Sequence, residues 1–140
     1  MFTSYFAQVP KIEYPVSIAR INSEWYDNPS YPKLAPSKEL LFDFKYGANK
    51  GDTEFYTTEF MRYLDTLEFK ESIQELSGIY GPDALDRLTL ICYEKPSDFC
   101  HRHLVANWLR QHGADIYERK FGEQPSCWMM SSTCCDLSSE

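Results

Sequence analysis

Residues 88–93 have the sequence LTLICY, a short and almost continuous apolar run. A run of this length between segments with turn-forming residues, such as Pro82 and Pro96, is typical of a strand covered on both faces. Apolar residues recur at helical spacing over residues 99–111 (FCHRHLVANWLRQ), and Gly113 follows as a C-terminal glycine. The segment 88–113 therefore predicts a central strand, a turn and a helix.

The rest of the chain extends this pattern on both sides. Residues 15–21 (PVSIARI) predict a first strand, and residues 115–119 predict an edge strand. Ser37 and Asp52 are positioned to cap two helices, and residues 71–76 predict a further short helix that ends before Gly78. The order strand, helices, strand, helix, strand predicts the α/β class, with a small, mostly parallel sheet and covering helices in a Rossmann-like three-layer arrangement.

The 140 residues suit one domain, and 43% of them are hydrophobic, which is enough for a core. We expect residues 1–124 to form a single α/β domain. Residues 125–140 are rich in Ser and Cys and have no periodicity, so we expect a flexible C-terminal tail.

The formal net charge of -7 argues against general nucleic-acid binding, which needs a basic face. A small nucleotide in a local pocket remains compatible with this charge. The sequence has no signal peptide and no apolar run of about 18 residues, so it predicts a cytoplasmic protein without a membrane partner. The five cysteines are an odd number, and the core is large enough not to need disulfides.

The start of the helix at residues 99–111 is the candidate functional site. Ser97 or Asp98 is the expected N-cap, which places Cys100 in the first turn. The positive end of the helix dipole favours the thiolate of Cys100, whereas the carboxylate of Asp98 opposes it. Helical spacing directs Cys100 and His101 inward and places Arg102 and His103 on more exposed faces.

Glu94 leaves the strand on the same face as Cys92 and so completes a candidate catalytic set with Cys100 and His101. Two structural alternatives stay open, because Cys100 can be buried filler and His101 can be a hydrogen-bonded core residue. Adjacent helical residues point about 100° apart, so Cys100, His101 and His103 are a poor ligand set and we predict no metal site. The sequence identifies no cofactor.

Residues 90–95 (LICYEK) and 100–109 (CHRHLVANWL) together resemble the signature of the DUF488 family, in which a strand ending in Cys-x-Glu leads to a Cys-His-Arg helix. Residues 17–20 (SIAR) before an aromatic loop, and residues 34–38 (LAPSK) before a helix, are similar as well, so the resemblance spans about residues 15–120. It implies a cytosolic α/β fold with Glu94, Cys100, His101 and Arg102 as signature positions, and it implies no particular reaction.

These patterns lead to one main hypothesis and one alternative. The main hypothesis is an enzyme or a binding protein for a small anion, a nucleotide or a phosphorylated metabolite, with Arg102, Ser97, Arg20 and Trp25 as candidate ligand-binding residues. The alternative is a non-catalytic binding or inhibitory module that acts through the aromatic loop at residues 22–36. A protein partner or a homo-oligomer is compatible with both, and the sequence leaves open whether the protein is an enzyme.

Overall fold

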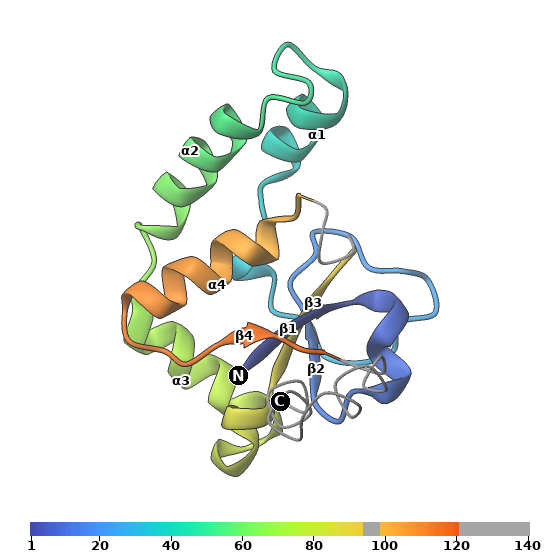
Figure 1. Ribbon diagram of the computed structural model, residues 1–140, viewed down its shortest axis with the longest axis vertical. Coiled ribbons are helices and arrows are strands. Elements are labelled where there is room, and N and C mark those ends of the chain that lie inside the picture. The colour runs from blue at the N-terminus through green and yellow to red at the C-terminus, as the bar shows by residue number, and fades with distance from the viewer. Residues whose placement is uncertain (94–98, 121–140) are drawn as a thin grey trace, which may run out of the picture.

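Four parallel strands form one sheet in the computed structural model, which describes residues 1–93 and 99–120 (Figure 1). In spatial order they are β2 (Pro15–Ser17), β3 (Thr89–Cys92), β1 (Phe2–Tyr5) and β4 (Tyr117–Glu118). Every residue of β3 is buried, as the apolar run at residues 88–93 predicts. The predicted α/β class with a parallel sheet is confirmed.

Two details of the sheet differ from the sequence-based prediction. The sequence gives no sign of β1, because its central residues Thr3 and Ser4 are polar, yet both are buried in the sheet. The strand predicted at residues 15–21 ends at Ser17, and the chain leaves the sheet soon after the amide of Ile18 bonds to the carbonyl of Ile91. Ile21 is consequently exposed to solvent.

The helices begin and end largely where their capping residues indicate. The α-helices are α1 (Lys38–Tyr46), α2 (Thr53–Leu64), α3 (Phe69–Tyr80) and α4 (His101–Gln111), and the 3-10 helices are η1 (Phe6–Lys11), η2 (Pro32–Leu34) and η3 (Pro82–Arg87). The side chains of Ser37 and Asp52 cap α1 and α2 as predicted. The helix predicted at residues 71–76 is longer, since Gly78 lies inside it and Gly81, with φ of 100°, ends it.

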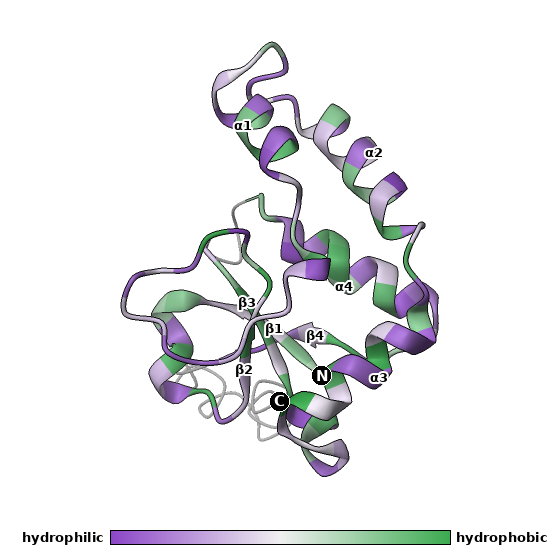
Figure 2. Cartoon of the chain, turned by 180° about the vertical axis from the view of Figure 1, so that it is seen from behind, coloured by the Kyte–Doolittle hydropathy of each residue, from purple (hydrophilic) through white to green (hydrophobic). Residues whose placement is uncertain are grey.

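Side chains alternate between the two faces of β3 and build two cores. Leu90 and Cys92 belong to the larger core, together with Trp108 and other apolar residues of α4. Ile91 belongs to a smaller core on the other face, which includes Phe6 of η1. The sheet is therefore covered on both faces, and Figure 2 shows that α4 carries hydrophobic residues beside hydrophilic ones.

Helices α1 and α2 lie side by side in a hairpin that extends beyond the sheet, with α2 packed against α4 (Figure 1). The hairpin thereby stands next to the start of α4, where the candidate site lies. No helix within residues 1–93 and 99–120 is long and apolar enough to cross a membrane. The predicted tail at residues 125–140 and the domain boundary at residue 124 lie outside the described residues.

Candidate functional site

A cavity of about 390 Å³ opens at the carboxyl ends of β2 and β3. Its walls come from the segment after β2, from α1 and α2, and from the start of α4. Parallel α/β sheets bind ligands at this edge, because the loops and helix N-termini there present unpaired polar groups. The cavity therefore occupies the position that the sequence predicts for the site.

One wall of the cavity is aromatic. Phe99 packs against Phe44 of α1 at a ring-centroid distance of 5.4 Å and against Tyr56 of α2 at 5.2 Å. Tyr93, which is 46% exposed, lines the cavity near the end of β3. Only the packing of the hairpin against α4 reveals that these rings border a cavity.

Two cationic side chains also line the cavity. Arg20 donates from Nε to the carbonyl of Pro36 at 2.9 Å and from Nη2 to that of Pro32 at 3.4 Å. These bonds hold the guanidinium in place and leave further N–H groups for a ligand. Lys45 comes from the last turn of α1 and is exposed. The structure thus places Arg20, but not the other predicted ligand-binding residues that it describes, in this cavity.

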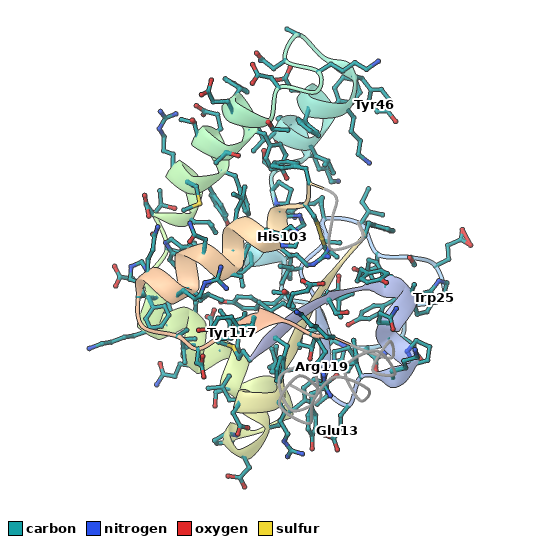
Figure 3. The ribbon with its side chains drawn as sticks, viewed as in Figure 1. Glu13, Trp25, Tyr46, His103, Tyr117 and Arg119 are labelled. Atoms are coloured by element: carbon teal, nitrogen blue, oxygen red, sulfur yellow. A yellow bond between two sulfur atoms is a disulfide. The ribbon has the colours of Figure 1, made fainter. Side chains whose placement is uncertain are left out.

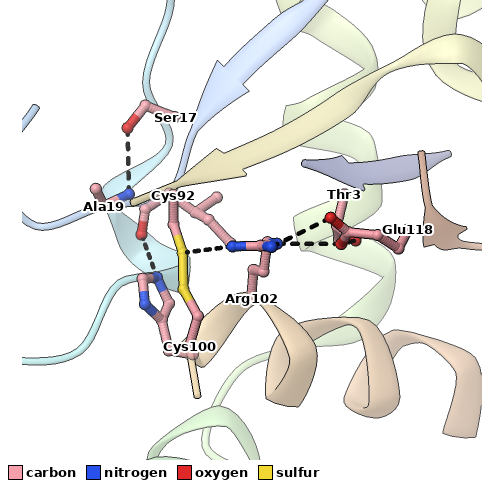
Figure 4. The surroundings of a disulfide bond; sticks show 9 residues. Thr3, Ser17, Ala19, Cys92, Cys100, Arg102 and Glu118 are labelled. Carbon is pink, nitrogen blue, oxygen red and sulfur yellow. Dashed lines mark hydrogen bonds and ion pairs between the residues drawn. A yellow bond between two sulfur atoms is a disulfide. The ribbon is translucent and has the colours of Figure 1, made fainter. Parts of the chain in front are cut away.

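Cys92 and Cys100 form a disulfide (Figure 4), and both residues line the cavity. The bond joins the end of β3 to the residue before α4, and the side chains are 1% and 5% exposed. The expectation that the chain has no need of a disulfide does not hold for this pair. The sequence shows both cysteines, but it does not show that the strand end and the helix start bring them together.

Cys100 is itself the N-cap of α4 and has an extended backbone, with φ of -153° and ψ of 143°. The prediction that Ser97 or Asp98 caps this helix is therefore wrong, because the helix begins at His101. Ser97, Asp98 and Glu94 lie outside the described residues. Cys100 still lies at the positive end of the helix dipole, which stabilises a thiolate when the disulfide is reduced.

His101 is buried, and its Nε2 donates a hydrogen bond of 2.6 Å to the carbonyl oxygen of Ile18. The pKa of the imidazole is lowered to about 4, mainly by burial and to a smaller extent by the charge of Arg102, while the bond to Ile18 partly opposes this change. The ring is therefore neutral at neutral pH. The predicted inward orientation of His101 is confirmed.

Arg102 is fully buried, so its predicted place on an exposed face is wrong. Its guanidinium bonds the carboxylate of Glu118 on β4 and lies 3.5 Å, measured from Nη1, from Sγ of Cys92 (Figure 4). Thr3 donates to the same carboxylate at 2.6 Å. The helix face is buried here because β4 supplies the carboxylate that neutralises Arg102. Arg102 does not line the cavity, and its guanidinium instead contacts the sulfur of Cys92 in the disulfide.

His103, predicted to be solvated, is half-buried. Trp25 does not line the cavity either; it is 56% exposed and contacts Phe6 with ring centroids 6.0 Å apart, near η1 (Figure 3). In the same loop Tyr31 is buried and donates to the carboxylate of Glu75 on α3. The loop at residues 22–36 is thus anchored on its own domain at Tyr31.

Ligand atoms of Cys92, Cys100 and His101 lie within 4.8 Å of one another and so form a potential metal-binding group. Two features of the surroundings disfavour a cation. The guanidinium of Arg102 lies next to Cys92, and the hydrogen on Nε2 of His101 is bound to Ile18. A positive charge beside the sulfur of Cys92 suits a thiolate there better than it suits a metal ion.

A wider cavity of about 830 Å³ lies at the amino ends of the strands, next to Phe2 and Asp115. Its lining is apolar and acidic, and it includes none of the Cys, His or Arg residues described above. The smaller cavity at the carboxyl ends is the better candidate, because nucleophilic, cationic and aromatic groups meet there.

Residues 8–113 match the family model DUF488-N3a, which describes the active DUF488-N3 subclade. Comparison with curated proteins and with solved structures finds no significant match. The matched region contains β2, β3, α1, α2 and α4, and hence the whole lining of the candidate cavity. The signature at residues 90–109 and the family match agree, and the chain belongs to the DUF488 family.

Proposed function

We propose that the protein binds a small anionic ligand with a planar ring, such as a nucleotide, in the cavity at the carboxyl ends of β2 and β3. The observation that carries this proposal is the combination of an aromatic wall with Arg20 and Lys45 around one cavity of about 390 Å³. Ligand sites of enzymes commonly have this size and this mixture of apolar surface with few polar groups. A phosphorylated metabolite without a ring would use the cations alone.

Each group has a distinct part in this binding. Arg20 is held by two backbone carbonyls, and its guanidinium is suited to bidentate contact with a phosphate. Lys45 adds a second positive charge from α1. The rings of Phe44 and Phe99 offer faces on which a base stacks.

Cys100 is the proposed nucleophile once the disulfide is reduced, because it lies at the start of α4 and borders the cavity. His101 is neutral and fixed to Ile18, so we assign it a positioning role at the base of the cavity. Glu94 remains the candidate acid or base, and Ser97 remains a candidate ligand-binding residue, on the grounds of sequence alone.

A thermal-shift screen of the reduced protein tests the binding. Nucleoside mono-, di- and triphosphates and sugar phosphates are added, since a ligand that binds only the folded state raises the melting temperature. We expect at least one of them to raise it, and we expect the double variant Arg20→Gln/Lys45→Gln to lose the shift. Lys70→Gln/Lys120→Gln removes the same number of charges at two exposed lysines outside the cavity lining, and this matched control should keep the shift.

Two results would count against the proposal: no shift with any compound, or an equal shift in the wild type and in the double variant. The role of Cys100 is tested separately with Cys100→Ser. This variant should still bind the ligand that the screen identifies but should not change it chemically. The reduced wild type should bind the same ligand and convert it to a product. Equal turnover by the two proteins would exclude Cys100 as the nucleophile.

A further inference from the structure

The two sulfur atoms of the disulfide lie in different surroundings. Both cysteines line the cavity, and Cys100 is the more exposed residue, at 5% against 1% for Cys92. Cys92 Sγ lies 3.5 Å from Nη1 of Arg102 (Figure 4). One sulfur therefore belongs to the residue that precedes α4, and the other lies beside a buried guanidinium.

This asymmetry matters for thiol–disulfide exchange, in which a thiolate attacks one sulfur and the other leaves as a thiolate. Exchange is faster when the leaving sulfur is the more stable anion. Attack on Cys100 makes Cys92 the leaving sulfur, and Arg102 already lies against it. Glu118 fixes the guanidinium through two bonds of 3.1 Å, so no rearrangement of Arg102 is needed.

We propose that the Cys92–Cys100 disulfide exchanges with a small anionic thiol that enters the cavity, as an activity separate from nucleotide binding. The thiolate of the substrate attacks Sγ of Cys100, the disulfide breaks, and its electron pair goes to Cys92 Sγ. A second substrate thiolate attacks the substrate sulfur of the mixed disulfide and releases Cys100 as a thiolate. Two substrate thiols are thereby oxidised to one disulfide, and the protein disulfide is reduced.

The charge of the cavity selects the class of thiol. Arg20 and Lys45 belong to the lining, which includes no carboxylate among the described residues. A low-molecular-weight thiol that carries carboxylates is therefore held by these cations, whereas a neutral thiol is not. Reduction also releases the thiol of Cys100 that the proposed catalytic role requires.

The test uses the oxidised full chain in which Cys127, Cys134 and Cys135, outside the described residues, are replaced by Ser. Reduced glutathione is the anionic probe, and 2-mercaptoethanol is the neutral probe. The reaction is stopped by alkylation at successive times, and peptide mass spectrometry locates the mixed disulfide. We expect glutathione on Cys100 and the alkyl group on Cys92. A mixed disulfide on Cys92, equal amounts on both, or no reaction would overturn the proposal.

Two sets of variants test the class of thiol and the leaving sulfur without relying on the location of the mixed disulfide. In Arg20→Gln/Lys45→Gln, glutathione should react about tenfold more slowly while 2-mercaptoethanol keeps its rate, since only the anionic thiol depends on these charges. Arg102→Met should slow the exchange with either thiol, because it removes the positive charge beside Cys92. Arg102→Lys keeps a positive charge and should retain much of the exchange rate. Unchanged selectivity for the anionic thiol in the double variant contradicts the assigned substrate class.

Where Arg102→Met fails to fold, Cys92→Ser and Cys100→Ser take its place. With glutathione disulfide as the probe, Cys92→Ser should acquire glutathione on Cys100 about tenfold faster than Cys100→Ser acquires it on Cys92, because Cys100 is the more exposed residue. Equal rates would reject the inferred order of attack. No nucleotide is present in these reactions, so their result does not depend on whether the protein binds a nucleotide. The thermal-shift screen uses the reduced protein, so its result likewise does not depend on thiol exchange.

Discussion

Glu118 holds the guanidinium of Arg102 with two hydrogen bonds of 3.1 Å, one from Nε to Oε1 and one from Nη2 to Oε2. The carboxylate comes from the edge strand β4, and the guanidinium comes from the first turn of α4. The pair therefore joins the helix that carries the candidate site to the far edge of the sheet, and it sets the distance between Arg102 and Cys92.

We expect Arg102→Met to lower the free energy of unfolding by about 3 kcal/mol, because it leaves the carboxylate of Glu118 without its main partner. Urea unfolding of the oxidised protein measures this loss. The double variant Arg102→Met/Glu118→Gln should regain part of it, since an amide tolerates the site better than an unpaired carboxylate. The single variant Glu118→Gln is measured as well. If the free-energy losses of the two single variants add up to the loss of the double variant, the two residues are not coupled and the prediction is wrong.

The burial of His101 predicts a dependence of stability on pH. Its pKa in the folded protein is about 4, below the value of about 6.5 in an unfolded chain, so the unfolded state binds the proton more tightly. The stabilisation is complete above about pH 6.5 and is lost as the pH falls towards 4, with a total of about 3 kcal/mol. Urea unfolding across this range should show the decline, and His101→Gln should show less of it. Identical slopes in both proteins would contradict the assignment.

Tyr31 fixes the aromatic loop by donating its hydroxyl to Glu75. Burial and Glu75 raise the pKa of Tyr31 to about 12, so the hydroxyl stays protonated at neutral pH. Tyr31→Phe should cost about 1 kcal/mol and should speed proteolytic cleavage within residues 22–36. Tyr80→Phe is the matched control, because its hydroxyl donates to the carbonyl of Pro15, which lies outside this loop. An equal effect of both substitutions on cleavage would argue against this anchoring role.

Ser37 caps α1 by accepting a hydrogen bond of 3.0 Å from the amide of Leu40. Ser37→Ala should cost about 1 kcal/mol and should also weaken ligand binding in the cavity, because α1 carries Phe44 and Lys45. Asp52→Ala removes the comparable cap of α2, which contributes Tyr56 alone to the lining, and should affect binding less. Thermal shifts with the same ligand compare the two variants, and an equal loss of binding would contradict the larger role of α1.

The sequence predicts the elements that have a simple periodic signal. The apolar run at residues 88–93 gives the central strand, and Ser37 and Asp52 mark the helices that they cap. Strand β1 escapes prediction because Thr3 and Ser4 are polar residues buried among strands that come much later in the chain. Such burial depends on tertiary partners, and no local pattern reports it.

The candidate site was predictable in place but only partly in geometry. Helical spacing correctly turns His101 inward, whereas Arg102 is misassigned because its partner Glu118 belongs to another element. The pairing of Cys92 with Cys100 likewise requires the relative position of a strand end and a helix start. The aromatic wall with Phe44 depends on how the hairpin of α1 and α2 packs against α4.

The position of β1 has a consequence for how the chain folds. Phe2 lies opposite Thr89 of β3 on one side and opposite Tyr117 of β4 on the other, so neither neighbour is available while only the first half of the chain exists. Closing such long loops makes folding slow compared with that of a helical bundle. Until β4 docks, β1 presents an open edge to other chains, so a truncation before Tyr117 should favour aggregation during synthesis.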